Sequence, residues 1–520
     1  MSRKLRVNNI VIVGGGTAGW MTSTTFVRLF PKKKITLIES PNIKTVGVGE
    51  STINQFRQWL SLVKIKDEDF MSSCDASYKF TIRFTNFNKI NSGRVEYPFS
   101  NPESIDDNRL NLWYFKKLLH PETPNTDYVD SFYPIMALVN SNKVYKGNEL
   151  TNFKFYDTTA FHFDATKFAL WLRDNICLPK VNHIKSNVKD IKTNDDGIES
   201  LTLDNGDVIT GDLFIDCTGF RSMLLGDVMG EEFIPYNHIL PNNKAWATHV
   251  NYTNKEKQLQ GVTNATALKN GWVWNIPLWS KIGTGYVYSD KYTTDEKALV
   301  EFKKHLKKNK HDIDDCEFTN IKMKIGIHEK LFVKNVVAVG LSAGFIEPLE
   351  SNGLYTVHEF LSYLTRMFER DNISQWDRDV YNYACRNTFH NWAEFVSMHY
   401  ALGERDDTKY WKDNLNREYE KGIRDLSPTQ HHGFRDHIVD KMYNFRFNEQ
   451  NGINCISAGY GYFPLSENTL RYGTRTEEFD YTPYMVSIKA LDDRKKAWND
   501  VVKDSPTLYE YLKKEVHNDV

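Results

Sequence analysis

In the first 40 residues, the apolar positions follow a strand pattern, then a helix pattern, then a strand pattern again. Residues 8–40 contain the apolar run NIVIV, the glycine-rich turn GGGTAGW, the helical stretch MTSTTFVRLF and a second apolar run, KITLIES. Short apolar runs bounded by turn residues are typical of buried strands. The pattern therefore predicts that the chain opens with one βαβ unit.

Strand patterns continue through the next two thirds of the chain. Apolar and polar residues alternate over 78–99, and several strands are expected between 183 and 222. Further strands are predicted around 245–250 and 270–290, and NVVAVG at 335–340 has the composition of a buried strand. We therefore predict an α/β fold with a mixed set of sheets for this part of the chain.

The pattern changes near residue 355 to helical spacing with many aromatic residues. The helical segments are LYTVHEFLSYLTRMFER, VYNYACRNTFHNWAEFVSMHYAL and DDRKKAWNDVVKDSPTLYEYLKK. We expect a first domain over 1–360 and a mainly helical module over 361–520. Because no Gly/Ser-rich linker separates them, the two are expected to share a core.

Composition excludes several classes of protein. A net charge of −1 over 520 residues gives no electrostatic footprint for nucleic acid or an anionic membrane. The six cysteines lie far apart with no CxxC, so they predict reduced, mostly buried thiols and no metal site. The N-terminal apolar run is too short for a signal peptide, and no stretch approaches a membrane span. We expect a cytoplasmic protein.

The first turn carries a dinucleotide-binding fingerprint. Its residues are Gly14, Gly15, Gly16, Thr17, Ala18 and Gly19, with Gly14, Gly16 and Gly19 forming G-x-G-x-x-G between a strand and a helix. Glycines there let backbone amides approach a pyrophosphate at the helix N-terminus. Glu39 ends the next strand and suits a ribose hydroxyl. This context favours a dinucleotide cofactor over a glycine turn without a ligand.

Two further segments contain candidate functional side chains. GWVWNIP places Trp272 and Trp274 on one side of a strand that ends at Pro277, which by itself indicates core packing. In YKFTIRF, alternation puts Lys79, Thr81 and Arg83 on one face of a strand. From periodicity alone, Lys79 is a lysine on a solvated strand face.

Taken together, these segments resemble a flavin-dependent halogenase of the tryptophan-halogenase type. The resemblance is carried by the fingerprint, by CDASYKFTIRFTNF, by GWVWNIP and by GFIEPLESNG at 344–353, and it covers nearly the whole chain. TVGVGEST, LFIDCTGFRS and NVVAVGLSAGFIEP are similar to segments that approach FAD in flavoprotein hydroxylases and halogenases. The fold implied is the FAD-binding, Rossmann-like domain of the flavoprotein hydroxylase type. The resemblance adds Glu50, Leu341 and Leu354 to the residues that contact the cofactor.

The resemblance also implies a reaction and its residues. Reduced FAD and oxygen convert a halide into hypohalous acid, which Lys79 relays to an electron-rich aromatic ring. Glu350 assists by polarising the halogen donor or accepting the ring proton. Asn352 and Gly353 lie where the family binds halide. Trp272, Trp274 and Phe99 would form a wall between the flavin and the substrate.

Partners follow from what the chain lacks. No separate nicotinamide domain is evident, so a separate NADH-dependent flavin reductase is expected to supply reduced FAD. The substrate is expected to be a small aromatic molecule, and a homo-oligomer is possible.

The chain departs from the family at several positions near the halide and the substrate. Position 352 is Asn where Thr is usual, and an amide is bulkier and can donate two hydrogen bonds. Tyr97-Pro98-Phe99-Ser100 replaces a more usual HPFG, so a substrate-side histidine is missing. Residues 453–456, INCI, stand where tryptophan-specific members carry an indole-stacking tryptophan, although Tyr443, Phe445 and Phe447 could still stack. Free tryptophan is therefore one candidate substrate among several.

Two alternatives remain open from the sequence. A single-component aromatic hydroxylase on the same fold would show no halide dependence and would place its substrate over the flavin. A flavin-binding protein without enzymatic activity is opposed by the presence of both Lys79 and Glu350.

Overall fold

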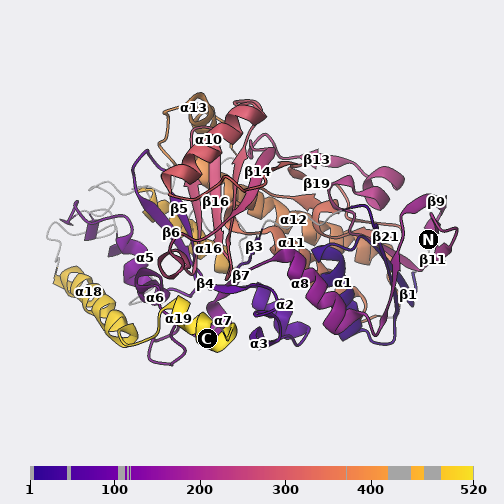
Figure 1. Cartoon of the computed structure of the whole chain (residues 1–520), viewed down its shortest axis with the longest axis horizontal. Coiled ribbons are helices and arrows are strands. Elements are labelled where there is room, and N and C mark those ends of the chain that lie inside the picture. Colours follow the sequence, from indigo (N-terminus) through magenta and orange to yellow (C-terminus); the bar gives the residue numbers. More distant parts are fainter. Residues whose placement is uncertain are drawn as a thin grey trace, which may run out of the picture. The chain divides into compact units, whose positions relative to one another are not determined.

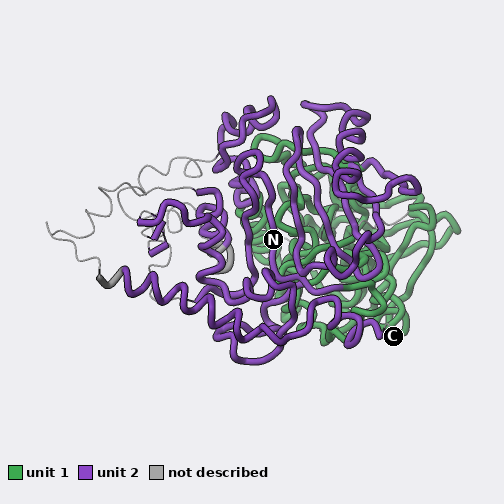
Figure 2. Tube along the Cα trace, turned by 60° about the vertical axis from the view of Figure 1, so that its left-hand side comes forward, with its two compact units in different colours: residues 1–76, 161–245, 321–393 green, residues 77–160, 246–320, 394–520 purple. Residues whose placement is uncertain are grey.

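The computed structural model describes residues 5–43, 49–103, 112–113, 116–117, 119–370, 372–419, 447–461 and 482–518. The chain divides into two compact units, shown in different colours in Figure 2. Unit 1 contains residues 1–76, 161–245 and 321–393, and unit 2 contains 77–160, 246–320 and 394–520. These units cut the chain at other places than residue 360, so the expected division into 1–360 and 361–520 stays a prediction.

Unit 1 is built on the predicted βαβ unit. Its main sheet has the order β20-β21-β12-β1-β2-β8, of which β1 and β21 are labelled in Figure 1. β1 pairs in parallel with β2 and β12, and β8 and β21 extend the parallel part on either side. The bounds are β1 Asn9–Val13, β2 Lys34–Glu39, β8 Val181–Lys185, β12 Leu213–Asp216, β20 Phe332–Val333 and β21 Val336–Ala338. Ile10 to Val13 are all buried, as expected for a parallel strand covered on both faces.

Helices and smaller sheets complete unit 1. α1 (Thr17–Leu29) follows β1 and packs against α8 (Ala165–Leu172) and α11 (Gly353–Met367). The antiparallel meander β9 (Val188–Asn194), β10 (Gly197–Leu203) and β11 (Val208–Thr210) forms a separate sheet. β3 (Glu50–Ser51) pairs through both of its residues with 162–163 of β7 (Ala160–Phe163), and α2 (Phe56–Leu62) follows.

Unit 2 contains a larger mixed sheet in the order β18-β14-β17-β16-β15-β5-β6. Its strands are β5 Thr81–Thr85, β6 Arg94–Pro98, β14 Lys244–Val250, β15 Val262–Ala267, β16 Gly271–Pro277, β17 Ile282–Tyr288 and β18 Thr319–Lys322. β5 and β15 are parallel, while the β15–β16–β17 meander is antiparallel. α10 (Asp295–Lys308) lies over this sheet (Figure 1). Its Phe302 belongs to the same buried cluster as Val273 and Tyr286.

The predicted change to helices after residue 355 is confirmed in the described residues. α11 is followed by α12 (Gln375–Ala401), α13 (Lys409–Leu415), α16 (Phe447–Gly459), α18 (Thr482–Val502) and α19 (Leu508–Tyr511). Within unit 2, α16 packs on β6: a methyl group at Gly452 would lie 2.9 Å from the ring of Tyr97. The α/β fold class with mixed sheets is likewise confirmed.

Two expectations drawn from the composition concern the cysteines and membrane-spanning segments. The cysteines are unpaired thiols, and all but Cys316 are buried, as predicted. Within the described ranges, no helix combines the length and the apolar character that crossing a bilayer would require.

Candidate active site

The fingerprint glycines of unit 1 are required by close backbone contacts. Gly14 has φ +120°, and a Cβ there would lie 2.1 Å from the carbonyl oxygen of Cys217. A Cβ at Gly19 would lie 1.9 Å from the carbonyl oxygen of Gly14. Only glycine fits at either position, so strand, turn and helix pack as tightly as a dinucleotide fold requires.

Gly16 differs from the other two because it faces open space. A Cβ built there meets no atom within 4 Å, and its extended backbone (φ −78°, ψ −173°) accepts any residue. Gly16 is also the N-cap of the 13-residue helix α1 and has no side chain to satisfy the first amides, while the first turn carries no acid. An open backbone at an uncapped helix N-terminus fits a pyrophosphate, so these residues suit FAD.

The structure brings the predicted ribose-binding acid to the same loop. A Cβ at Gly15 would lie 2.4 Å from the Glu39 side chain. Oε2 of Glu39 contacts Nε2 of His183 at 2.7 Å. His183 lies on β8, the strand that pairs with β2. Because Glu39 and His183 are 144 residues apart in the sequence, their contact could not be predicted from the sequence.

A third segment, the turn Gly340–Ser342, packs closely against helix α1. Gly340, with φ +75°, begins the short turn Gly340–Ser342, and a Cβ there would lie 2.8 Å from Cβ of Ala18. Leu341 in this turn is 40% exposed, and Leu354 on α11 is buried. The fingerprint and the segment around Leu341 therefore meet at Ala18.

The EPLESNG loop of unit 1 packs against β3. A Cβ at Gly353 would lie 2.9 Å from Oε1 of Glu50, and Oγ of Ser51 donates to Oγ of Ser351 at 3.1 Å. Ser351 adopts a left-handed conformation (φ 58°), which is costly for a residue with a side chain. Such local strain, maintained by surrounding contacts, is common in functional loops.

Polar side chains of this loop are fully buried. Glu347 and Glu350 are both 0% exposed. Glu347 stands at the start of a short helical turn and accepts a hydrogen bond from Nδ2 of Asn242 at 2.8 Å, which indicates a structural role. Asn352 is 1% exposed, and its amide has no hydrogen-bond partner among the residues that the structure describes. An unsatisfied buried amide is costly, so Asn352 fits a position that contacts a ligand such as a halide.

In unit 2, the structure corrects the solvated-face interpretation of Lys79. Lys79 ends β4 (Ser77–Lys79) and is 0% exposed, with Nζ 4.8 Å from the centre of the Phe99 ring. Thr81 is also fully buried, and Glu96 accepts a hydrogen bond from Nε of Arg83 at 2.5 Å. Alternation failed because all three residues of β4 are buried, and a 2-residue period cannot reveal a second buried face.

The segment with Lys79 is joined to the tryptophan strand. Oγ of Ser77 donates to the carbonyl oxygen of Pro277, the last residue of β16, at 2.7 Å. Trp272 and Trp274 lie on β16 with ring centroids 6.4 Å apart, and both are buried. The end of the tryptophan strand at Pro277 was predicted correctly, whereas the Ser77 contact was not predicted.

Gly285 on β17 leaves the space that Trp274 fills. It is the register partner of Trp274, and a Cβ there would lie 2.1 Å from Cη2 of the indole and 2.5 Å from the carbonyl oxygen of Trp246. Glycine in a strand often marks such close approach, and IGTG at 282–285 pairs with WNIP at 274–277, so the glycine opposite the indole was the available signal.

Gly285→Ala should therefore displace the Trp274 indole. We expect a loss of about 1–3 kcal/mol in the free energy of unfolding, as for overpacked cores, measured by urea denaturation. The loss should be smaller in a Trp274→Phe background, because the phenyl ring lacks the atoms nearest to the new methyl group. An equal loss in both backgrounds would show that the indole is not the obstacle.

The residues that depart from the family are only partly described. Tyr97 and Phe99 are buried beside each other, and Asn454 is buried on α16. Tyr443 and Phe445 lie outside the described residues, and so does the side chain of Phe447. The 45–48 part of TVGVGEST also lies outside them.

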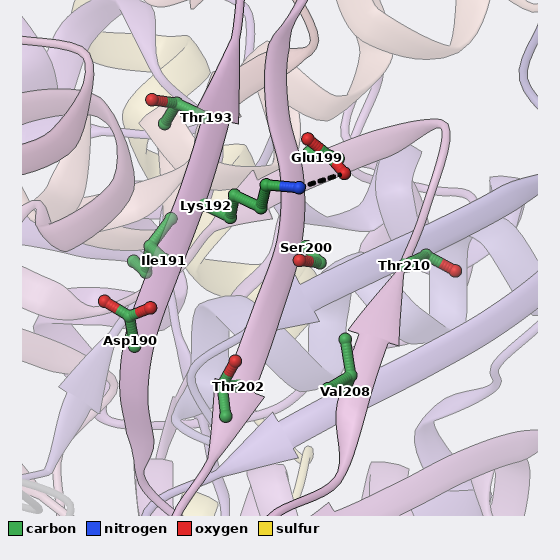
Figure 3. A pocket seen from close by; sticks show the side chains of 9 residues that line it. All are labelled: Asp190, Ile191, Lys192, Thr193, Glu199, Ser200, Thr202, Val208 and Thr210. Carbon is green, nitrogen blue, oxygen red and sulfur yellow. Dashed lines mark hydrogen bonds and ion pairs between the residues drawn. The ribbon is translucent and has the colours of Figure 1, made fainter.

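A solvent-open hollow of about 670 Å³ lies elsewhere in unit 1, on β9–β11 (Figure 3). Its polar lining includes the exposed ion pair Lys192–Glu199, with Nζ and Oε1 2.8 Å apart. None of the residues predicted to act in the reaction lines it. We assign it no role in catalysis. Across the described parts of the chain, no group of three or more His, Cys, Asp or Glu side chains is arranged to hold a metal.

Comparisons with known proteins agree with this geometry. The tryptophan halogenase family model matches residues 9–472. SttH, a tryptophan 6-halogenase from Streptomyces toxytricini, is 34% identical over 435 residues, which are 79% of this chain and 81% of SttH. Among solved structures, apo VirX1 has a TM-score of 0.89 and 38% identity, covering 98% of this chain and 100% of VirX1. Tar14, a tryptophan C-6 flavin-dependent halogenase from taromycin biosynthesis, has a TM-score of 0.85 and 29% identity, covering 97% of this chain and 99% of Tar14.

The fold, the flavin-type loop and these matches define an enzyme class, the flavin-dependent halogenases. Within that class, the chain belongs to the tryptophan halogenase family. The Rossmann-like fold expected from the resemblance is confirmed, and the hydroxylase alternative is not favoured.

Proposed function

We propose that this enzyme halogenates electron-rich aromatic molecules, using Lys79 to transfer the halogen. The observation that carries the proposal is the complete burial of Lys79 beside the Phe99 ring. A buried lysine is rare unless it is paired or functional. Reduced FAD, when bound, supplies the electrons with which oxygen oxidises a halide to hypohalous acid.

The residues of the FAD site are proposed from the fingerprint and from the resemblance to the family. Gly14, Gly15, Gly16, Thr17, Ala18 and Gly19 would hold the pyrophosphate, with Glu39 at a ribose. Glu50, Leu341 and Leu354 would contact the remainder of the cofactor. A separate NADH-dependent reductase would supply the reduced flavin, and the enzyme would act in the cytoplasm.

The halogen transfer needs an amine and a base. Lys79 would hold hypohalous acid by a hydrogen bond, or its amine would react with the acid to give a haloamine and water. The aromatic ring then attacks the halogen, the N–X bond of the haloamine or the O–X bond of the bound acid breaks, and the leaving nitrogen or oxygen takes up a proton. The halogenated ring then loses its own proton. Glu350 would accept that proton or polarise the halogen donor. Trp272, Trp274 and Phe99 would separate the substrate from the flavin, which disfavours direct hydroxylation.

The test is a reconstituted reaction with a panel of substrates. A flavin reductase, NADH, FAD and oxygen would be combined with each halide in turn, and products identified by mass spectrometry. SttH and Tar14 are named as tryptophan halogenases, but Tyr97 and residues 453–456 of this chain differ from the tryptophan-specific pattern. We therefore expect several electron-rich aromatics to be accepted. Hydroxylated products without halide dependence would overturn the proposal.

Purified protein should bind FAD reversibly, without covalent attachment. Gly16→Val should weaken binding by about tenfold or more, because its side chain would fill the open space meant for the pyrophosphate. The backbone at Gly16 accepts valine, so the free energy of unfolding should change little. Gly14→Ala is the contrasting variant, since its clash with Cys217 should lower stability as well. Wild-type protein that fails to bind oxidised or reduced flavin would reject this site.

Halide choice should depend on Asn352. Bromide and iodide are better nucleophiles than chloride and are more easily oxidised, and the amide changes the side chain beside the halide. We expect turnover with bromide or iodide to exceed turnover with chloride, and Asn352→Thr to shift the ratio toward chloride in competition assays. Efficient chlorination of free tryptophan alone, with bromide and iodide inferior, would contradict this prediction.

A further inference from the structure

A groove of about 690 Å³ runs along one side of α10 in unit 2. We call it the α10 groove. Its other walls come from the loop after β5, the turn between β15 and β16, and residues 405–407. None of the residues proposed to act in halogenation lines it, so the groove is a separate feature.

The floor of the α10 groove exposes large apolar side chains to solvent. Ile90 is 52% exposed and Val300 is 68% exposed, and Leu268, which is partly buried against the core, also lines the groove. Val300 does not serve the core, because α10 buries Ala298, Phe302 and Leu306 instead. An exposed apolar floor with a polar rim is characteristic of an interaction site.

The rim is predominantly basic. Lys269, Lys297, Lys304 and Lys308 line the groove, and their ammonium groups have no ion pair or hydrogen bond in the part of the chain that the structure describes. Three acids, Glu296, Glu301 and Asp407, also line the groove, against five cationic side chains, the four lysines and Arg405. Two of these acids are already engaged. Glu301 accepts hydrogen bonds from the amide of Lys269 at 2.9 Å and from Tyr286 at 3.0 Å, and Asp407 accepts from Nε of Arg405 at 2.6 Å.

The one histidine in the lining adds no positive charge at neutral pH. Burial lowers the pKa of His305 to about 4, with smaller contributions from His311 and Lys308. The net positive charge of the rim therefore comes from the lysines and is constant over the physiological range.

We propose that the α10 groove binds an acidic, amphipathic segment of a partner protein. Apolar side chains of that segment would cover Ile90, Leu268 and Val300, and its carboxylates would meet the unpaired lysines. The groove follows α10 from Glu296 to Lys308, about 18 Å at 1.5 Å per residue, which matches about three turns of a partner helix. Apolar anchors at i, i+3 or i+4, and i+7 would then fit the floor. Charge complementarity selects an acidic partner over a basic one or a second copy of this near-neutral chain.

The test uses the full chain and a synthetic probe. The probe is a fluorescein-labelled helical peptide of 14 residues with leucines at helical spacing and glutamates elsewhere, measured by fluorescence anisotropy. Matched peptides carry lysine in place of glutamate, or serine in place of leucine. We expect the acidic peptide to bind about tenfold more tightly than either matched peptide, and high salt to weaken it.

Charge reversal on α10 locates the binding. Lys304→Glu should weaken binding of the acidic peptide by about tenfold. Lys307 is an exposed lysine of the same helix outside the groove, so Lys307→Glu should change the affinity by less than about twofold. Equal losses in the two variants, or equal binding of acidic and basic peptides, would overturn the proposal.

Two other outcomes also overturn it. Displacement of the peptide by millimolar inorganic phosphate would show a site for small anions. Self-association of the free enzyme that Lys304→Glu abolishes would assign the groove to a second copy of the chain.

Discussion

Lys79→Ala is expected to abolish halogenation while the oxidation of reduced flavin continues at nearly the normal rate. Lys79 acts after the halide has been oxidised, so the two activities should separate. Halogenated product would be measured by mass spectrometry, and flavin oxidation and hydrogen peroxide by absorbance in the same samples. The expected loss is the whole of the product signal above background.

Burial of Lys79 makes a stability control necessary. The side chain is fully buried, so alanine leaves a cavity that could destabilise unit 2. Lys79→Met keeps most of the apolar stem and removes only the amine. Both variants should lose halogenation, and the methionine variant should unfold at the same urea concentration as the wild type. Halogenation at the wild-type rate in Lys79→Met would refute the proposed relay.

Glu350→Gln should slow halogen transfer by about 10²–10⁴-fold, the usual contribution of a general acid or base. Glutamine keeps the size and hydrogen-bonding ability of the side chain but cannot accept the ring proton. Single-turnover halogenation would be followed by mass spectrometry, with reduced flavin supplied in excess. Flavin oxidation should again be nearly unchanged.

Glu347→Gln is the matched control for Glu350→Gln. Glu347 is equally buried, lies three residues earlier in the same loop, and accepts a hydrogen bond from Asn242. Its glutamine variant can still accept that bond, so we expect near-normal turnover. Equal slowing in both variants would indicate a structural role for the loop acids, and near-normal turnover in Glu350→Gln would shift the base role to another group.

The sequence predicted the fold correctly where structure depends on patterns among residues close together in the chain. The strand, glycine turn and helix of residues 9–29 appear at the predicted positions, because apolar runs and glycine constraints act over a few residues. The tryptophan strand also ends at Pro277 as expected, since proline cannot extend the ladder. The helices after residue 355 were evident from their spacing.

The sequence by itself thus determined the α/β class, the dinucleotide fingerprint and the family, because these depend on local pattern and motif. Only the tertiary structure decided that Lys79 is buried on a strand covered on both sides, and that Glu39 meets His183. It also decided that Gly285 makes room for Trp274 and that the Asn352 amide is enclosed without a hydrogen-bond partner among the described residues. Each of these depends on residues far apart in the chain, and a pattern along one strand carries no information about what packs on its second face.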